Sequence, residues 1–283
     1  MIKNKRILIT GGAGSIGSEL VRQLAIHNKV FILDQNETGA FDLREELKQE
    51  GHWVHSRTGD IRDINVVRDV FEDFKPQYVF HAGALKHVTP NEEYPLEAIQ
   101  TNILGTYNVM SEAKKWKCLE KFVFISTDKV IHGTSIMGAT KRVGEIMVRN
   151  QGKGFVAVRF GNVMGSRGSV IPLWQKQMNE GKPLTITDPK MKRYMMTIPD
   201  ACGLVIEAAQ QGKGGEVFIL DMGEQVNILE LALDILQKAG KNPINPNNIK
   251  LIGIRPGETL DEKLMSEEEE KLATKQGNFY VIK

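Results

Sequence analysis

The side chains best suited to acid–base chemistry stand together in one short stretch of the sequence. Asp128 and Lys129 follow an apolar run, K-F-V-F-I, typical of a fully buried parallel strand, so both emerge at its carboxyl end. Thr127 precedes them, and Met137 and Lys141 stand four residues apart in the helical pattern that follows, so these two share one helix face. A carboxyl group beside an amine can supply the acid and the base of an elimination. These five residues form the candidate catalytic set.

A glycine-rich turn near the N-terminus predicts where a nucleotide binds. The expected strand 6–10 runs into G-G-A-G-S-I-G, and a helical pattern begins at Ser18. Between a strand and a helix, such glycines allow a tight turn, close approach of the backbone to a pyrophosphate, and close helix packing, while the helix N-terminus faces the phosphates. The cofactor-binding candidates of this turn are Gly11, Gly14, Ser15, Ile16 and Gly17.

Asp34 ends the second expected strand, about 20 residues beyond the glycines, where a carboxylate can accept hydrogen bonds from the adenosine ribose. An acid there favours NAD over NADP, because it would repel a 2′-phosphate. A turn aspartate after any strand has the same sequence pattern, so that alternative stays open.

Further cofactor candidates follow the third and fourth expected strands. Asp60 and Ile61 come after the strand near 53–57, and Asp60 could meet the adenine amino group, although Asp60 or Asp63 could equally cap a helix. Asn102 is a poor helix former inside the helical segment 97–116, which indicates a packing or site role. The small residues after the fourth strand, which would let backbone pack along the cofactor, are Ala82, Gly83 and Ala84.

The alternation of strands and helices predicts an α/β fold, a Rossmann-type doubly wound parallel sheet with a smaller C-terminal substrate-binding region. Ligands of such sheets bind at the carboxyl ends of the strands. We expect an NAD-binding domain over 1–165 with interleaved segments at about 199–225, and a substrate region over 166–198 and 226–283.

Four basic residues are candidate substrate ligands. Arg167, Arg193 and Arg255 each stand beside Gly, Tyr or Pro, and a planar guanidinium matches the oxygens of a diphosphate. Lys86 follows a strand end on the ligand side and could face a phosphate or a sugar. Each of the four could instead be an ordinary surface side chain.

Composition indicates a protein without a nucleic-acid or membrane footprint. The 283 residues include 37 basic and 35 acidic side chains, a net charge of +2, without long runs apart from 267–270, which is expected to be a solvated helix face. No apolar run is long enough to span a bilayer, and because residues 6–10 already form an expected strand, no leader segment is expected. Cys118 and Cys202 lack metal-type spacing, so no metal site is predicted. A reducing, cytoplasmic location fits best.

Seven motifs together give the chain a family resemblance. They are G-G-A-G-S-I-G, H-A-G-A-L-K-H-V, T-N-I-L-G-T, S-T-D-K, M-G-A-T-K-R, R-F-G-N-V and R-P-G-E. The set resembles the extended short-chain dehydrogenase/reductases, and more narrowly the nucleotide-sugar 4,6-dehydratases of polysaccharide biosynthesis that act on UDP-N-acetylglucosamine. The resemblance runs in order from Arg6 to about Leu264, nearly the whole chain.

This resemblance implies roles for the candidate residues. An Asp-Lys pair performs the elimination in that family, which corresponds to Asp128 and Lys129, while Thr127 and Lys141 take the positions that bind the reacting hydroxyl and the nicotinamide ribose. The substrate is then a UDP-sugar. Its diphosphate and ribose are expected on Asn162, Arg193, Arg255 and Glu258, and its uracil near residues 168–172, which include Val170.

Met137 departs from the superfamily pattern, which has tyrosine four residues before the lysine. A thioether cannot accept the hydroxyl proton, so the first proton acceptor is left open. A subset of the dehydratases similar to membrane-anchored glycan enzymes also carries methionine here, so the chain is expected to be a short soluble form of that subgroup. The family further implies a homodimer, formed by the helices near 102–116 and 137–149.

Two other functions compete with the dehydratase. A UDP-sugar 4-epimerase or reductase would rely on the missing tyrosine and has no need of an acid and a base at Asp128 and Lys129. A catalytically silent NAD-binding sensor or scaffold has no reason to keep the two groups together at a ligand-facing strand end. For the elimination, Lys129 must be neutral, which burial and the cation Lys141 would favour, and Asp128 must be protonated, so the pair is expected to share one proton.

Overall fold

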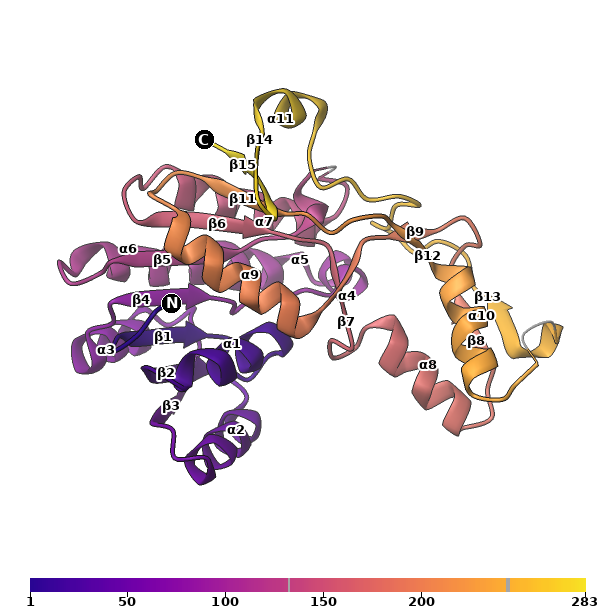
Figure 1. The fold of residues 1–283 in the computed structure, drawn as a ribbon, viewed down its shortest axis with the longest axis horizontal. Helices are drawn as coiled ribbons and strands as arrows, with labels where there is room; N and C mark the ends of the chain where they lie inside the picture. The colour runs from indigo at the N-terminus through magenta and orange to yellow at the C-terminus, as the bar shows by residue number, and fades with distance from the viewer. Residues whose placement is uncertain (132, 243–244) are drawn as a thin grey trace.

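A nine-stranded sheet forms the larger part of the protein in the computed structural model, which describes residues 1–131, 133–242 and 245–283 (Figure 1). Its strands are parallel, except that β15 runs antiparallel to β11, and β14 antiparallel to β15. Across the sheet the strands are β14 (Thr274–Gln276), β15 (Phe279–Ile282), β11 (Val217–Leu220), β6 (Phe155–Arg159), β5 (Lys121–Ile125), β4 (Tyr78–His81), β1 (Arg6–Thr10), β2 (Lys29–Asp34) and β3 (Val54–Thr58).

Helices cover both faces of this sheet, as the continuous apolar runs of its central strands require. Every residue of β5 and β6 is buried. The helices of one face are α1 (Ser15–Ala25), α2 (Glu37–Gln49) and α9 (Ile198–Gln211), and those of the other are α3 (Ile64–Phe74), α6 (Thr106–Lys115) and α7 (Ile136–Arg149) (Figure 1). The predicted doubly wound sheet is confirmed.

The single helix expected over 97–116 is instead three consecutive pieces. They are α5 (Pro95–Ala98), the π-helical η1 (Ile99–Gly105) and α6. Asn102 lies in η1, where its side chain accepts a hydrogen bond from Leu85 N at 2.8 Å and donates one to Leu85 O at 3.0 Å. The poor helix former thus holds the segment that follows β4, which gives it a packing role at a helix irregularity.

A smaller lobe carries a hydrophobic core of its own and lies beside the carboxyl ends of the strands (Figure 1). Trp174 is fully buried there, and its indole Nε1 donates to Thr185 O at 2.9 Å. The lobe consists of α8 (Val170–Asn179), β8 (Leu184–Ile186), α10 (Ile228–Lys238), η3 (Pro246–Asn248) and β13 (Ile249–Leu251). The ribbons β7 (Asn162–Met164) with β10 (Met195–Thr197), and β9 (Lys192–Arg193) with β12 (Val226–Asn227), join it to the sheet.

The C-terminal segment differs from its expected place. Residues 274–282, expected in the substrate region, form two strands of the main sheet. The acidic run lies in α11 (Glu267–Leu272), which begins with a capping box between Ser266 and Glu269, yet Glu269 is buried although a solvated face was expected. Within the described residues, no helix is long and apolar enough to cross a membrane.

Candidate active site

The glycine turn between β1 and α1 brings separate stretches of backbone into contact. Gly11 has a φ of +67°, and a Cβ there would lie 2.6 Å from the Cα atom of Gly83. A Cβ on Gly17 would lie 2.0 Å from the carbonyl oxygen of Gly11. Gly14 caps α1 without a side chain, so the first N–H groups of the helix stay available to an anion. Larger residues at Gly11 and Gly17 would push the turn apart.

A cavity of about 210 Å³ opens where this turn meets the ends of β2 and β4. Glycine backbone, a helix N-terminus and a strand-end carboxylate converge on it, which fits a dinucleotide. Ser15, Ile16 and Gly17 form the first turn of α1 beside it. The predicted cofactor residues that line the cavity are Gly11, Gly14, Asp34, Ile61, Ala82, Gly83 and Ala84.

Asp34 and Asp60, the two acids predicted to face the cofactor, have different surroundings. Asp34 accepts hydrogen bonds from Ala13 N and Asn36 N, each at 2.8 Å, so its carboxylate fastens the glycine turn to the end of β2. Asp60 accepts from Arg62 N at 2.8 Å and from Arg62 Nε at 2.6 Å. The helix cap left open in the sequence is Asp63, which accepts from the backbone N–H of residue 65.

Asp128 and Lys129 lie in η2 (Asp128–Val130), directly after β5. Asp128 is 1% exposed, and its Oδ1 accepts hydrogen bonds from Thr127 Oγ1 at 2.9 Å and from Lys129 Nζ at 3.1 Å. Its other oxygen, Oδ2, has no hydrogen-bond partner among the described residues. A buried carboxylate oxygen without a partner is costly, and a ligand hydroxyl would satisfy it.

The Lys129 ammonium has two further partners from distant parts of the chain. Its Nζ atom lies 3.2 Å from Asn162 Oδ1 in β7 and 2.6 Å from Glu262 Oε2, in the segment before α11. Glu262 is 4% exposed, and its Oε1 lies 3.3 Å from Arg193 Nε. Two carboxyl groups therefore contact one amine at the end of β5.

These contacts make Asp128 and Lys129 an ion pair. Burial raises the pKa of Asp128, but the Lys129 ammonium and the hydrogen bonds it accepts outweigh burial, so its pKa lies below 3.8. Burial lowers the pKa of Lys129, but Asp128 and Glu262 outweigh it, so its pKa lies above 10.5. The expectation of a neutral lysine beside a protonated aspartate is wrong for this arrangement, because the attraction between the two charges, to which Glu262 adds, outweighs the effect of burial.

Glu262 and Lys141 both have pKa values near neutrality. Burial raises the pKa of Glu262 to about 7, with Lys129 opposing and Asp128 adding to the rise. Burial lowers the pKa of Lys141 to about 7 against the attraction of Glu145. Lys141 and Met137 both lie buried in α7, and the Lys141 Nζ atom is 4.1 Å from the centre of the Phe124 ring.

The predicted substrate residues divide into two groups. Arg193 belongs to the first, because its buried guanidinium donates to the carbonyl oxygens of Thr259 and Leu260 and contacts Glu262. It therefore holds the turn that carries Glu262, and the structure shows it engaged there. Asn162 also joins this group through Lys129.

The second group gathers around the segment after β4. Lys86 Nζ donates to Arg167 O at 2.7 Å. Arg255 is half exposed and pairs with Glu258 Oε1 at 2.5 Å, in a loop that packs against α4 (Val88–Glu93). Val170 begins α8 and packs on the core of the smaller lobe.

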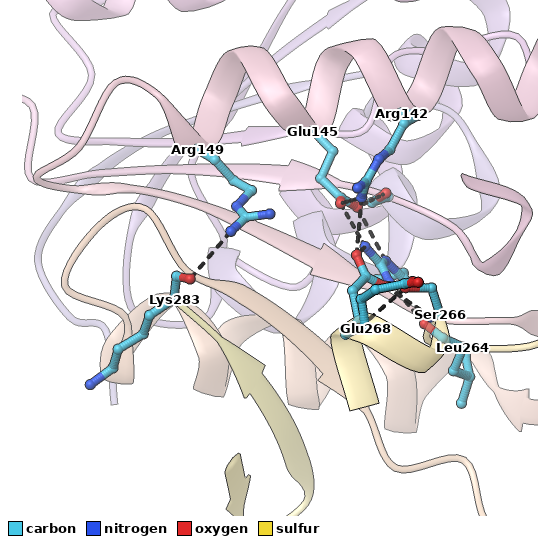
Figure 2. Close-up of polar contacts among 10 residues, drawn as sticks. Arg142, Glu145, Arg149, Leu264, Ser266, Glu268 and Lys283 are labelled. Atoms are coloured by element: carbon cyan, nitrogen blue, oxygen red, sulfur yellow. Dashed lines mark hydrogen bonds and ion pairs between the residues drawn. The ribbon is translucent and has the colours of Figure 1, made fainter. Parts of the chain in front are cut away.

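A buried ion network lies behind the site, between α7 and the C-terminal segment (Figure 2). Arg159 in β6 is fully buried, with Nη2 2.6 Å from Glu145 Oε1 and Nη1 2.6 Å from Glu269 Oε2. Arg142 Nη1 contacts the same two carboxylates at 2.8 and 3.1 Å. Ser126 Oγ donates to Glu145 Oε2 at 2.7 Å, which ties the end of β5 to the helix that carries Lys141.

Sequence reasoning missed both Glu262 and this network. Arg159 had a usable signal, because it interrupts the apolar strand F-V-A-V-R-F. Glu145 stands four residues after Lys141 and so shares its helix face. Glu262 had no local signal, since it contacts Lys129 across 133 positions of sequence.

Comparison with known sequences finds relatives along the whole chain. The model of a family described as "Polysaccharide biosynthesis protein" matches residues 7–283. The capsular polysaccharide biosynthesis protein CapD of Staphylococcus aureus is 45% identical over 278 residues, which are 95% of this chain and 46% of CapD. The chain thus spans about half the length of that relative. A UDP-glucose 4-epimerase of Rickettsia bellii is 38% identical over 298 aligned positions, covering 100% of this chain and 84% of the epimerase.

Two solved structures are similar over most of the chain. Pen from Bacillus thuringiensis is 37% identical, with a TM-score of 0.91, and the match covers 99% of this chain and 88% of Pen. The UDP-glucose 4-epimerase of Thermus thermophilus, in complex with NAD, is 27% identical, with a TM-score of 0.77, and the match covers 89% of this chain and 88% of the epimerase.

Proposed function

Since the chain belongs to the polysaccharide biosynthesis protein family, we propose that it converts UDP-N-acetylglucosamine to the 4-keto-6-deoxy sugar nucleotide, by NAD-dependent 4,6-dehydration, for surface glycan synthesis. The observation that carries the proposal is the buried Asp128–Lys129 pair, with one unpartnered carboxylate oxygen, at the end of β5. β5 adjoins β4, whose end lines the cofactor cavity. Elimination beside a ketone needs an acid and a base there.

The cofactor is NAD, in agreement with the dinucleotide cavity, the Asp34 carboxylate at its edge and the similar epimerase structure that contains NAD. When bound, NAD supplies the oxidation at carbon 4 of the hexose and the return of the hydride to carbon 6, so that no net redox change occurs.

Each catalytic candidate has a task in this scheme. Thr127 binds the carbon 4 hydroxyl, and Lys141 holds the nicotinamide ribose. Lys129 removes the carbon 5 proton, which the new ketone makes acidic, and Asp128 protonates the departing carbon 6 hydroxyl. Met137 shapes the site without taking a proton, because a thioether has no basic site for one.

The substrate binds to the residues that lie around the segment after β4. Arg255, Arg167 and Lys86 supply positive charge for the diphosphate, and Glu258 accepts a ribose hydroxyl. The uracil lies near Val170, at the start of α8. Arg193 acts on the substrate through the Glu262 turn in the present arrangement.

A 4-epimerase is the second candidate, because the Rickettsia bellii relative, which aligns with this chain over 84% of its own length, is named a UDP-glucose 4-epimerase. Met137, where an epimerase of this superfamily would use tyrosine, argues against it. Incubation with UDP-N-acetylglucosamine separates the candidates by mass spectrometry and NMR. A product lighter by one water supports the dehydratase, an isomer of equal mass supports the epimerase, and unchanged substrate indicates a silent NAD-binding protein.

We also propose that the chain forms a homodimer through η1, α6 and α7. Large apolar side chains on these helices are exposed by 39–52%, although they are common core residues: Ile99, Leu104, Tyr107, Val143 and Ile146. Light scattering should give roughly twice the chain mass of 31.7 kDa. A mass of one chain at micromolar concentration would exclude this contact.

A further inference from the structure

Glu262 occupies an unusual position for a residue outside the sheet. It belongs to the irregular segment before α11, yet it is 4% exposed, and each of its carboxyl oxygens contacts a cation. Oε2 lies 2.6 Å from Lys129 Nζ, and Oε1 lies 3.3 Å from Arg193 Nε. Gln225 Nε2 donates to the main-chain oxygen of Glu262 at 2.7 Å, which holds the turn from the other side. The carboxyl group is thus fixed in one orientation toward Lys129.

Lys129 cannot act as a base while it keeps its third proton. Its ammonium is held by Asp128 Oδ1 at 3.1 Å, Asn162 Oδ1 at 3.2 Å and Glu262 Oε2 at 2.6 Å, and all three contacts favour the charged form. The shortest of the three, to Glu262 Oε2, is a charge-assisted hydrogen bond to a carboxylate. Glu262 is therefore the nearest acceptor for the proton that Lys129 must lose.

Whereas Lys129 must lose a proton, Asp128 must gain one before it can protonate the leaving hydroxyl. Its carboxyl group and that of Glu262 contact the same Lys129 Nζ atom, so the two lie close together. The Asp128 Oδ2 atom is buried and has no partner among the residues that the structure describes. A proton on Glu262 thus has an acceptor beside it.

We propose that Glu262 is a positioning residue of the elimination centre, which carries the Lys129 proton to Asp128. This inference rests on the proposed dehydration. In the first transfer an N–H bond of Lys129 breaks and an O–H bond forms on Glu262, leaving a neutral amine and a neutral acid. In the second, Glu262 returns to carboxylate as Asp128 is protonated. Lys129 then takes the carbon 5 proton while Asp128 gives its proton to the carbon 6 oxygen, which leaves as water. The three groups end as they began, and no oxidant or reductant is needed.

The charge environment of Glu262 suits a group that both takes and gives a proton. The charged groups that face it are Asp128 and Lys129 from η2 and Arg193 from β9. Burial raises the pKa of Glu262 to about 7, with the two cations opposing and Asp128 adding to the rise. The pKa of Glu262 lies between that of Lys129 and that of Asp128, so a path through Glu262 divides one large uphill proton transfer into two smaller ones.

The test compares Glu262→Gln and Glu262→Asp with a matched control, Asp261→Asn, which removes the neighbouring exposed carboxylate. With UDP-N-acetylglucosamine, NADH absorbance reports carbon 4 oxidation and mass spectrometry reports loss of water, over roughly pH 6 to 9. We expect Glu262→Gln to oxidise carbon 4 but to dehydrate about 100-fold more slowly, without the Glu262 titration near neutrality that we expect in the native protein. Glu262→Asp should keep that titration at a reduced rate, and Asp261→Asn should match the native protein.

Two failures are distinguishable in this experiment. If the native protein releases no water from the substrate, the proposed function fails and the proton path fails with it. If the native protein dehydrates, but Glu262→Gln does so at the same rate with the same pH profile, only the proton path is overturned. Should Glu262→Gln fail to fold, Glu262→Asp decides, because a folded variant that loses the titration near neutrality would contradict the proposal.

Discussion

Replacement of Glu269 by glutamine should weaken the attachment of α11 to the sheet and lower the free energy of unfolding by about 3 kcal/mol. The Glu269 carboxylate accepts hydrogen bonds from Arg159 at 2.6 and 3.0 Å and from Arg142 at 3.1 Å. Burial raises its pKa, but the Arg159 hydrogen bonds and charge outweigh burial and lower it from 4.5 to about 2. This lowering of the Glu269 pKa, from 4.5 to about 2, corresponds to about 3 kcal/mol of folding free energy at neutral pH. Breaking a buried ion pair costs a similar amount, about 3–5 kcal/mol.

The sign of the pH dependence follows from the lowered pKa of Glu269. The stabilisation is fully present above the unfolded pKa of about 4.5 and disappears as the pH falls towards about 2. Urea unfolding followed by circular dichroism should therefore show Glu269→Gln less stable than the native protein by about 3 kcal/mol at pH 7, with the difference shrinking below about pH 5. The control Glu270→Gln, an exposed neighbour, should stay within about 0.5 kcal/mol. An equal stability at pH 7, or a difference that does not change with pH, would show that the Glu269 carboxylate does not stabilise the fold through its charge.

Four further substitutions test the assignments in the site. Lys129→Met should still produce NADH absorbance with the substrate but release no dehydrated product, and native amounts of product would exclude Lys129 as the base. Asp34→Ala should weaken NAD binding by about 1.5–3 kcal/mol in calorimetry, because it removes a charged acceptor at the cavity edge and frees Ala13 N; unchanged affinity would contradict its role. Arg255→Ala should weaken UDP binding by a similar amount at an unchanged melting temperature, whereas Arg193→Ala should lower the melting temperature, because its buried guanidinium holds the Glu262 turn. Equal effects of the two arginine substitutions on melting temperature would show that Arg193 is not structural.

The parts of the fold that sequence could predict are those determined within a short stretch of chain. The strand before Gly11, the glycine turn and α1 follow from apolar periodicity and from the φ that Gly11 must adopt. The position of Asp128 and Lys129 directly after β5 could be predicted in the same way, because a strand end places its next residues at the ligand edge of a parallel sheet. The short polar strand Thr274–Gln276 carries no such pattern, and it joins the sheet only through pairing with β15.

The charge state of the site could not be predicted, because it depends on contacts between residues far apart in sequence. Asp128 and Lys129 could share a proton in either direction, and their mutual attraction, to which Glu262 adds, favours the ion pair over the neutral forms. Arg193 had the residue type of a diphosphate ligand, but the carbonyl groups at residues 259 and 260 and the Glu262 carboxylate occupy its donors. Propensity and spacing contain no information on which distant segment packs over a strand end.

In the proposed reaction, one active site oxidises carbon 4, eliminates water and returns the same hydride to carbon 6. UDP-N-acetylglucosamine carrying deuterium at carbon 4 tests it most directly, with the label located in the product by NMR. We expect a dehydrated product with the deuterium on carbon 6. Deuterium that stays on carbon 4 of an isomer of unchanged mass would contradict the claim and favour the epimerase, and a dehydrated product without deuterium at carbon 6 would contradict the internal hydride return.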